Sequence, residues 1–335
     1  MVNVSQEAIT LSHHLLRELR RAGRHPELSI LLDQVAFAGK TLARELGRAA
    51  LVGRLGLVGE RNATGDAQKK LDVFANQVMI DAFSDVGLIA SIVSEELDEI
   101  REIECTKAAA YILCTDPLDG SSNIDTNAPV GTIFGFYRRS ARGQCHALEE
   151  LRSGLEMAAA GYILFGPSTI LVYTRGQGVH GFTLDVGVGE FLLSNESIRC
   201  PDRGTLVAAD VGRYPEWKAP VRRFVDGLLG GDGEGQRRAS VRHSGAFVAD
   251  VHRILLEGGL YFYPPNADHP KGKLRLLYEC APLALVVEQA GGRASTGQKR
   301  ILDLRPESPH QQVPLVIGSR ENVAEYERFQ ASSGS

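Results

Sequence analysis

The sequence has few cysteines, no long basic run and no unbroken hydrophobic segment of membrane-spanning length. Its cysteines are odd in number, scattered and never arranged as Cys-x-x-Cys, so we expect small buried side chains rather than disulfides or a zinc site. This usage fits a reducing cytoplasm. Because the net charge is −4 and no basic run is present, nucleic acid is not an expected partner. The five cysteines are Cys105, Cys114, Cys145, Cys200 and Cys280.

The longest uncharged segment, residues 157–174, approaches the length of a membrane span. Gly161, Gly166 and Pro167 interrupt it, so we expect two buried strands joined by a turn instead. The N-terminal segment mixes acidic and basic residues in a helical pattern, which predicts no signal peptide. A membrane is therefore not an expected partner.

A length of 335 residues exceeds the usual size of a single core, and a content of 43% hydrophobic and 23% charged residues is ordinary for a soluble enzyme. We expect two domains, residues 1–193 and 194–335. The chain contains no internal repeat. Helices are expected within residues 6–55 and at 71–86 and 278–290, and strands at 88–93, 111–114, within 131–193 and at 313–317. Alternation of helices and strands in both halves predicts a layered α/β sandwich.

The most specific feature is the run Asp116-Pro117-Leu118-Asp119-Gly120-Ser121-Ser122-Asn123, which follows a short apolar strand pattern at 111–114. Open α/β sheets place ligands at the carboxyl ends of strands. Pro117 favours an extended backbone before it, so Asp116 and Asp119 are expected to project toward a common point. A tight acidic turn is the plainer interpretation, but eight residues in this order are far more specific. Carboxylates suited to Mg²⁺ beside serine amides suited to phosphate predict a phosphoryl-transfer site.

This run resembles the metal-binding signature of the Mg-dependent, lithium-sensitive sugar and inositol phosphatases. Together with Asp125 and residues 131–135 it looks like class I fructose-1,6-bisphosphatase, and a second long match covers residues 271–280. The similarity extends from about Glu27 to about Gly318. The resemblance implies a two-domain fold with the active site between the domains, two or more Mg²⁺ ions per subunit, and a homo-oligomer, a tetramer in the family. It also implies hydrolysis of the 1-phosphate of fructose 1,6-bisphosphate by a metal-activated water, in gluconeogenesis or in carbon fixation.

The resemblance assigns roles to the acidic residues. Glu95 and Glu96 follow a strand pattern, and neighbouring residues on a strand point to opposite faces, so they are expected to do different work. In the family, Glu96 activates water together with Asp72. Without the family match, Asp72 would be interpreted as an acidic residue that stabilises a helix N-terminus, and Glu279 as an exposed glutamate at a helix start. The implied metal ligands are Glu95, Asp116, the Leu118 carbonyl, Asp119 and Glu279, with Asp66 for a further, more mobile ion.

The substrate residues show where this chain departs from the family. The asparagine that binds the distal phosphate aligns with Asp210, and two family tyrosines align with His243 and Arg213. An ionised aspartate cannot donate a hydrogen bond and repels phosphate, although Arg213 can offset its charge. Arg242 matches an arginine that enters the neighbouring subunit's site. The implied substrate-binding residues are Asp119, Gly120, Ser121, Ser122, Asp210, Arg242, Tyr263 and Lys273.

These departures keep alternative functions open. A remodelled distal pocket favours sedoheptulose 1,7-bisphosphate as an alternative or second substrate. Inositol monophosphatase activity is disfavoured because the match at 271–280 belongs to the sugar bisphosphatases. A catalytically dead sugar-phosphate sensor is a different class of function, and it is disfavoured because the acidic ligands are retained.

Inhibition by AMP is expected to be weak or absent. The turn that matches the family's nucleotide site, residues 23–29, has His25 and Ser29 where threonines stand, and Pro26 removes an amide donor. A lysine position reads Ala110. Only Tyr111 and Arg138 persist, which is too little to define a nucleotide site.

Overall fold

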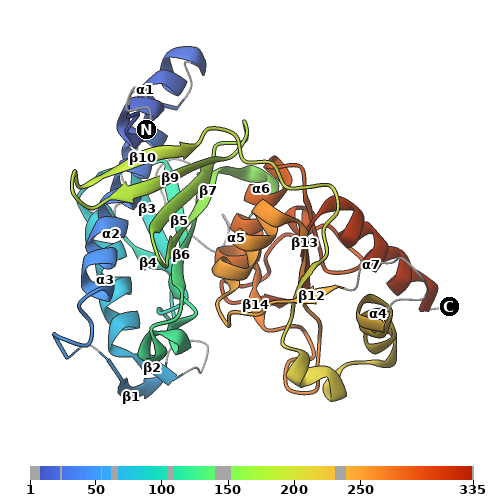
Figure 1. Cartoon of the computed structure of the whole chain (residues 1–335). Helices are drawn as coiled ribbons and strands as arrows, with labels where there is room; N and C mark the ends of the chain where they lie inside the picture. Colours follow the sequence, from blue (N-terminus) through green and yellow to red (C-terminus); the bar gives the residue numbers. More distant parts are fainter. Residues whose placement is uncertain are drawn as a thin grey trace, which may run out of the picture.

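The computed structural model describes residues 8–22, 25–53, 55–61, 67–103, 109–139, 152–230 and 239–333 (Figure 1). It confirms the predicted layered α/β sandwich. The helices are α1 (Leu11–Ala22), α2 (Glu27–Leu46), α3 (Lys70–Ser84), α4 (Ala219–Gly230), α5 (Phe247–Glu257), α6 (Ala281–Gln289) and α7 (Arg320–Ser333), with short helical turns η1 (Ser121–Thr126), η3 (Gly154–Glu156), η4 (Val211–Glu216), η5 (Leu276–Cys280) and η6 (Ile301–Asp303).

The first sheet has the strand order β10-β9-β8-β7-β6-β5-β3-β4, and all neighbours are antiparallel except β3 and β5. The interrupted apolar segment forms two buried antiparallel strands, β7 and β8, as expected. The strands are β3 (Ile89–Ser94), β4 (Arg101–Glu102), β5 (Tyr111–Asp119), β6 (Val130–Arg138), β7 (Met157–Phe165), β8 (Thr169–Thr174), β9 (His180–Asp185) and β10 (Glu190–Asn195).

The second sheet has the order β12-β11-β13-β17-β15, and two short pairs, β1–β2 and β14–β16, stand apart from both sheets. Its strands are β11 (Leu206–Ala208), β12 (Ser240–Val241), β13 (Gly259–Tyr263), β15 (Arg293–Ser295) and β17 (Leu315–Gly318). The short pairs comprise β1 (Leu57–Arg61), β2 (Ala67–Lys69), β14 (Leu274–Arg275) and β16 (Gln312–Val313).

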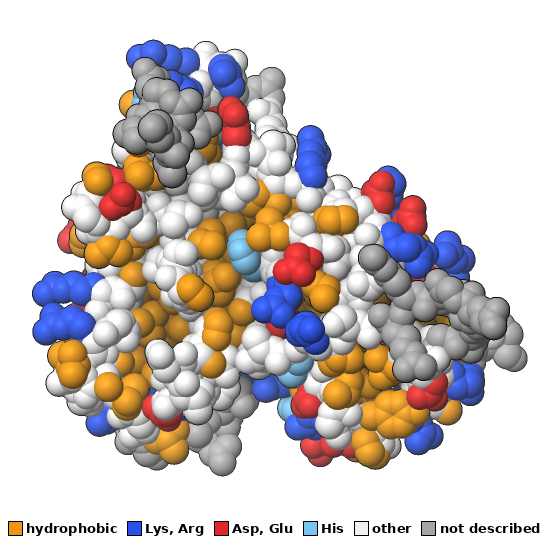
Figure 2. All heavy atoms as spheres, in the orientation of Figure 1, with side chains coloured by type: hydrophobic (Ala, Val, Ile, Leu, Met, Phe, Trp, Pro, Cys, Tyr) orange, Lys and Arg blue, Asp and Glu red, His pale blue; other side chains and the backbone are white. Residues whose placement is uncertain are grey.

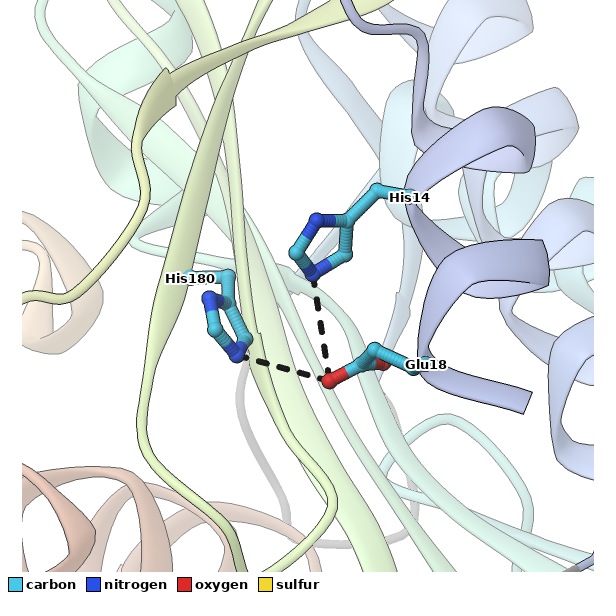
Figure 3. A group of neighbouring side chains, drawn as sticks. All are labelled: His14, Glu18 and His180. Atoms are coloured by element: carbon cyan, nitrogen blue, oxygen red, sulfur yellow. Dashed lines mark ion pairs between the residues drawn. The ribbon is translucent and has the colours of Figure 1, made fainter. Parts of the chain in front are cut away.

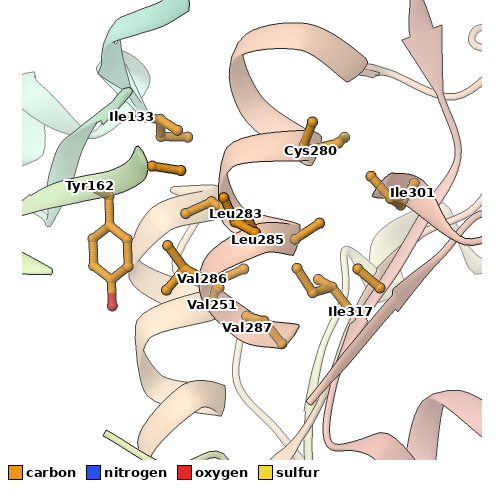
Figure 4. Packing of buried hydrophobic residues seen from close by; sticks show 14 of the residues in the cluster. Ile133, Tyr162, Val251, Cys280, Leu283, Leu285, Val286, Val287, Ile301 and Ile317 are labelled. Atoms are coloured by element: carbon orange, nitrogen blue, oxygen red, sulfur yellow. The ribbon is translucent and has the colours of Figure 1, made fainter. Parts of the chain in front are cut away.

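Three hydrophobic clusters hold five layers together. Helices α1, α2 and α3 pack on one face of the first sheet, while α5 and α6 lie between the two sheets. Helices α4 and α7 cover the outer face of the second sheet, and strand alternation makes this possible: Leu260 and Phe262 face α4 and α7, whereas Tyr261 faces the middle layer. Residues 281–287 of α6 are all apolar and buried, as expected for a helix packed between two sheets (Figure 4). The middle cluster joins residues from both sides of residue 193.

Three expectations need correction. Strand β5 does not stop at Cys114 but continues through the aspartate run to Asp119. Strand β3 ends at Ser94, so Glu95 and Glu96 lie in the following turn, where the opposite-face argument does not apply. The late helix begins two residues early, as the π-helical turn η5.

Two smaller observations concern the cysteines and the possibility of a membrane-spanning helix. Cys114, Cys200 and Cys280 are free and buried, as expected, whereas the other two cysteines lie outside the described residues. None of the described helices combines the length and apolar character that crossing a membrane requires.

Candidate active site

A cleft of about 490 Å³ lies between the first sheet and the C-terminal half of the chain. Charged and histidine side chains group along the middle of the face shown in Figure 2, between areas richer in hydrophobic side chains. A larger hollow, about 770 Å³, lies beside the end of α2, but none of its described lining residues belongs to the predicted site. The cleft is lined by Asp72, Glu95, Glu96, Asp116, Leu118, Asp119, Gly120, Ser121, Ser122, Asp210, Tyr263, Lys273 and Glu279.

One described residue of the predicted site does not line this cleft, and another predicted residue is not described. Arg242 lies on the exposed surface, where its Nη1 donates to the Val241 carbonyl at 2.8 Å. Asp66 lies outside the described residues. The cleft therefore gathers all described residues of the predicted site except Arg242, which is exposed.

A break in strand register brings the two aspartates together. Residues three apart on a regular strand point to opposite faces, but the pairing of β5 with β6 shifts between Asp116 and Asp119. The ligand oxygens of Asp116, Asp119 and Glu279 all lie within 4.8 Å of one another. Backbone donors fix the two aspartates: Leu118 N donates to Asp116 Oδ1 at 3.0 Å, and Val248 N donates to Asp119 Oδ2 at 2.7 Å. This convergence was predicted, but through the proline rather than the register shift.

Glu279 and Glu95 share a buried arginine. Arg275 N donates to Glu279 Oε2 at 2.7 Å, and Arg275 Nη1 lies 3.1 Å from Glu95 Oε1 and 3.8 Å from Glu279 Oε2. Glu279 is only 3% exposed and Arg275 only 4%, so the glutamate is no surface helix-start residue. Sequence reasoning gave Arg275 no role, although it lies inside the match at 271–280; a basic residue four positions before a predicted ligand was the available signal.

The electrostatics of this cluster call for a cation. Burial, together with the nearby Glu95 carboxylate, raises the pKa of Asp119 to about 7 and that of Glu279 to about 8, although hydrogen bonds from backbone N–H groups lower both. Burial together with Glu95 and Asp119 also holds the pKa of Asp116 well above its ordinary value. Four acidic side chains against one arginine leave an excess of negative charge. Since the side chains that converge here offer only oxygen ligands, the donor set fits Mg²⁺.

Asp72 and Glu96 lie in the same cleft as the metal-site carboxylates. Asp72 occupies the third position of α3, where its Oδ2 accepts a hydrogen bond from Lys69 N at 2.7 Å. It therefore caps the helix and faces the cleft at once. Burial raises the pKa of Asp72 to about 6. Glu96 is held by the turn after β3, with its N donating to Ser94 Oγ at 3.3 Å.

The motif is tied to the opposite wall of the cleft. Gly120 has a φ of 76°, in the left-handed region, and a Cβ at this position would collide with Ala246. Asn123 Nδ2 donates to the Ser244 carbonyl at 2.9 Å. Glycine at this position thus allows the aspartate run to approach the start of α5, and Ser121 and Ser122 follow it into the cleft.

The far end of the cleft carries mixed charge. Arg213 Nε lies 3.4 Å from Asp210 Oδ2, so the arginine offsets this aspartate as expected, although Arg213 also pairs with other carboxylates. His243 Nδ1 lies 2.9 Å from Asp250 Oδ2, and this hydrogen bond raises the pKa of His243. Lys273 is a further cation in the lining. The distal end thus combines the cations Arg213 and Lys273 and the imidazole of His243 with several carboxylates.

The turn matched to the nucleotide site is described from residue 25 onward. His25 has a φ of 54°, and its carbonyl accepts a hydrogen bond from Arg175 Nη2 at 3.2 Å. Pro26 stands at the N-cap of α2 and makes no side-chain cap. Gly23 and Arg24 lie outside the described residues, and the expectation of weak AMP inhibition stays a prediction.

Comparisons with known proteins agree along the chain. Residues 9–196 match the family model of the fructose-1-6-bisphosphatase N-terminal domain, and residues 200–331 match that of the C-terminal domain. A protein of Acaryochloris marina named fructose-1,6-bisphosphatase class 1 2 is 59% identical over 96% of each chain. A class 1 fructose-1,6-bisphosphatase of Trichormus variabilis is 46% identical over 97% of this chain and 93% of its own. The crystal structure of Leishmania major fructose-1,6-bisphosphatase in holo form has a TM-score of 0.91 and 35% identity, over 97% of this chain and all 100% of that one.

Proposed function

Because this chain belongs to the fructose-1,6-bisphosphatase family, we propose that it removes the 1-phosphate of fructose 1,6-bisphosphate, giving fructose 6-phosphate and inorganic phosphate. The single observation that supports this most is the convergence of Asp116, Asp119 and Glu279 within one cleft that also contains Tyr263 and Lys273. The proposed metal ligands and the proposed sugar-phosphate residues thus line the same cleft.

Two or more Mg²⁺ ions are proposed at the carboxylates. Glu95, Asp116, Asp119 and Glu279, with the Leu118 carbonyl, would hold them, and a further ion at Asp66 is proposed from the resemblance alone. When bound, the ions would neutralise these carboxylates and stabilise charge that develops on the transferring phosphoryl group.

The chain's own residues then act on water and substrate. Glu96 and Asp72 are proposed to take the proton of the attacking water, and a pKa near 6 suits Asp72 to accept a proton near neutral pH. The amides and hydroxyls of Ser121 and Ser122, with the open backbone at Gly120, are proposed to hold the 1-phosphate. Their position in the cleft beside Asp119 supports this assignment.

The remaining substrate contacts involve the sugar and the distal phosphate. Tyr263 and Lys273 are proposed to hold the sugar bisphosphate. Arg242 is proposed to enter the site of a neighbouring copy, as its exposed position outside its own cleft supports, and a homotetramer is proposed accordingly. Asp210 is proposed to lie at the distal phosphate, compensated by Arg213.

A second substrate, sedoheptulose 1,7-bisphosphate, is proposed because Asp210 and His243 both line the distal end. We further propose a cytoplasmic enzyme of gluconeogenesis or carbon fixation. Domains 1–193 and 194–335 are also proposed, and the gap between the two family matches, at 196 and 200, supports a boundary close to residue 193.

Phosphate release with Mg²⁺ and each of three substrates tests the function: fructose 1,6-bisphosphate, sedoheptulose 1,7-bisphosphate and inositol phosphate. We expect turnover of both bisphosphates and little turnover of inositol phosphate.

Asp119→Asn should lower kcat by on the order of 10²–10³-fold, as loss of one well-placed electrostatic group does, whereas Asp81→Asn on the exposed face of α3 should not. Tight bisphosphate binding without turnover would identify a sensor and refute the proposal. If Asp210→Asn leaves the ratio of the two kcat/KM values unchanged and fructose bisphosphate strongly preferred, the second substrate is wrong.

A further inference from the structure

A second group of metal-ligating side chains lies outside the cleft, between α1 and β9 (Figure 3). It consists of His14 and Glu18 from the helix and His180 from the first position of the strand. We propose that these three residues bind a divalent transition-metal ion, Zn²⁺ above all, and that the ion fastens α1 to the first sheet.

The three ligand atoms already lie close to the separations that such an ion needs. His14 and Glu18 are one helical turn apart and so share a face of α1. His14 Nε2 lies 3.8 Å and His180 Nε2 3.5 Å from the same atom, Glu18 Oε1, and all three ligand atoms lie within 4.8 Å of one another. Zinc bonds of about 2.0–2.1 Å in a tetrahedron place neighbouring ligands about 3.3 Å apart. Small side-chain movements would bring the three atoms to these separations, and a water would be the fourth ligand.

The groups behind the ligands orient them as metal sites require. His180 Nδ1 bonds to the Glu196 carbonyl, which can only accept, so in the neutral ring the proton is on Nδ1 and the lone pair is on Nε2. The other oxygen of the glutamate, Oε2, accepts from Tyr173 Oη at 2.9 Å and lies 3.7 Å from Arg175 Nη1. Glu18 is thus held with Oε1 toward both imidazoles.

His14 supplies an independent observation. It is only 7% exposed, and its Nε2, which points at Glu18 and His180, has no hydrogen-bond partner within the described part of the chain. Leaving such an atom buried and unpaired costs about 1–3 kcal/mol, which a metal bond would offset.

The competing explanation is a protonated histidine paired with Glu18. The centroid of the His14 ring is 4.6 Å from that of the His180 ring, too close for two imidazolium ions. Arg21 on α1 and Arg175 just after β8 add positive charge near the histidines, whereas Glu196 adds negative charge. A protonated His180 would satisfy Glu18 but would leave His14 Nε2 without a partner.

The ligand chemistry separates this site from the cleft. Two imidazole nitrogens and one carboxylate favour Zn²⁺ or Co²⁺ over Mg²⁺, whereas the carboxylates of the cleft favour Mg²⁺. Excess Mg²⁺ can therefore saturate the cleft while leaving the histidine site to the transition metal.

The test uses the full chain, stripped with a chelator and then held in excess Mg²⁺, with Zn²⁺ binding measured by equilibrium dialysis and the visible spectrum recorded with Co²⁺. Wild type should bind one Zn²⁺ per chain and give the strong absorption of four-coordinate Co²⁺. His180→Gln and His14→Gln should each weaken binding at least 10- to 100-fold, the loss expected for removing even an outer-shell partner. His13→Gln, which changes the exposed histidine beside His14 on the same helix, is the matched control and should bind like wild type.

Thermal unfolding gives a second readout, independent of catalysis. Zn²⁺ should raise the Tm of wild type and of His13→Gln, but not that of His14→Gln or His180→Gln. Far-UV circular dichroism shows whether each variant is folded. Two ligand variants are used so that the test survives if one of them fails to fold. Equal Zn²⁺ stoichiometry in wild type and in a folded His180→Gln would overturn the proposal. So would the absence of Zn²⁺ binding by wild type in Mg²⁺, the outcome expected for a simple ion pair.

Discussion

Removing the buried arginine of the carboxylate cluster should make the protein depend on divalent ions for its stability. Arg275 is the cation that lies between Glu95 and Glu279, and Arg275→Met keeps most of its length while deleting its charge. Without it, the buried carboxylates lose a close partner, and divalent ions bound in the cleft can take over its role.

The magnitude follows from burial. Breaking a buried pair by removing one partner costs about 3–5 kcal/mol, because an uncompensated charge stays buried. An unfolding entropy of about 2.1 cal/mol/K per residue gives about 0.7 kcal/mol/K for 335 residues, so the Tm in chelator should fall by about 4–7 °C. Mg²⁺ at about 100 times its Kd adds about 2.7 kcal/mol per site to the folded state. Its affinity should rise in the variant, because a competing positive charge has gone.

The assay is calorimetric unfolding in chelator and in Mg²⁺ for wild type, Arg275→Met and the control Arg293→Met. Arg293 pairs with Glu327 at 2.8 Å but is 45% exposed, and surface pairs are worth about 0–1 kcal/mol. If Arg275→Met unfolds in chelator within about 1 °C of the control, or if Mg²⁺ stabilises it no more than wild type, Arg275 does not neutralise the buried carboxylates.

Three further predictions concern activity and pH. Glu96→Gln should lower kcat far more than it raises KM, as steady-state kinetics will show; an unchanged kcat with a raised KM would assign Glu96 to binding instead. The bond to Asp250 raises the pKa of His243, so its stabilising effect is fully present below about pH 6.5, the unfolded value, and is lost as pH rises through the folded value. The difference in unfolding free energy between wild type and His243→Gln should therefore shrink from pH 6 to pH 9, and a constant difference would contradict this. AMP titrated against activity should inhibit weakly or not at all, and half-inhibition at low micromolar AMP would show that the turn at His25 binds nucleotide after all.

Much of the fold was predictable because its signals are local. The helical period at 71–86 became α3, and the glycine-interrupted segment at 157–174 became β7 and β8. The π-helical start of η5 was not predictable, because π-helical turns are rare and have no simple propensity signal; in the structure Glu279 Oε2 accepts a hydrogen bond from Arg275 N just before it. The same is true of β5, whose extension through the aspartate run depends on pairing with β6.

The candidate site divides in the same way. The cleft contains the acidic residues expected from the motif, but their roles stay predictions. Arg275 carried no signal as a partner of Glu95, since the two are far apart in sequence and meet only through folding. The metal-ligating group at His14 could not be predicted for the same reason. A His-x-x-x-Glu spacing on a helix is common, and His180 joins it only because folding brings β9 beside α1.

The sequence by itself determined the family, the layered α/β class and the side chains that line the cleft, because each depends on residue type and short-range order. Only the tertiary structure decided how those side chains are charged and held. Desolvation, the register shift between Asp116 and Asp119, and the arginine between Glu95 and Glu279 all arise from segments distant in the chain. Electrostatic interactions depend on distance in space and on burial, and neither quantity exists until the layers have packed.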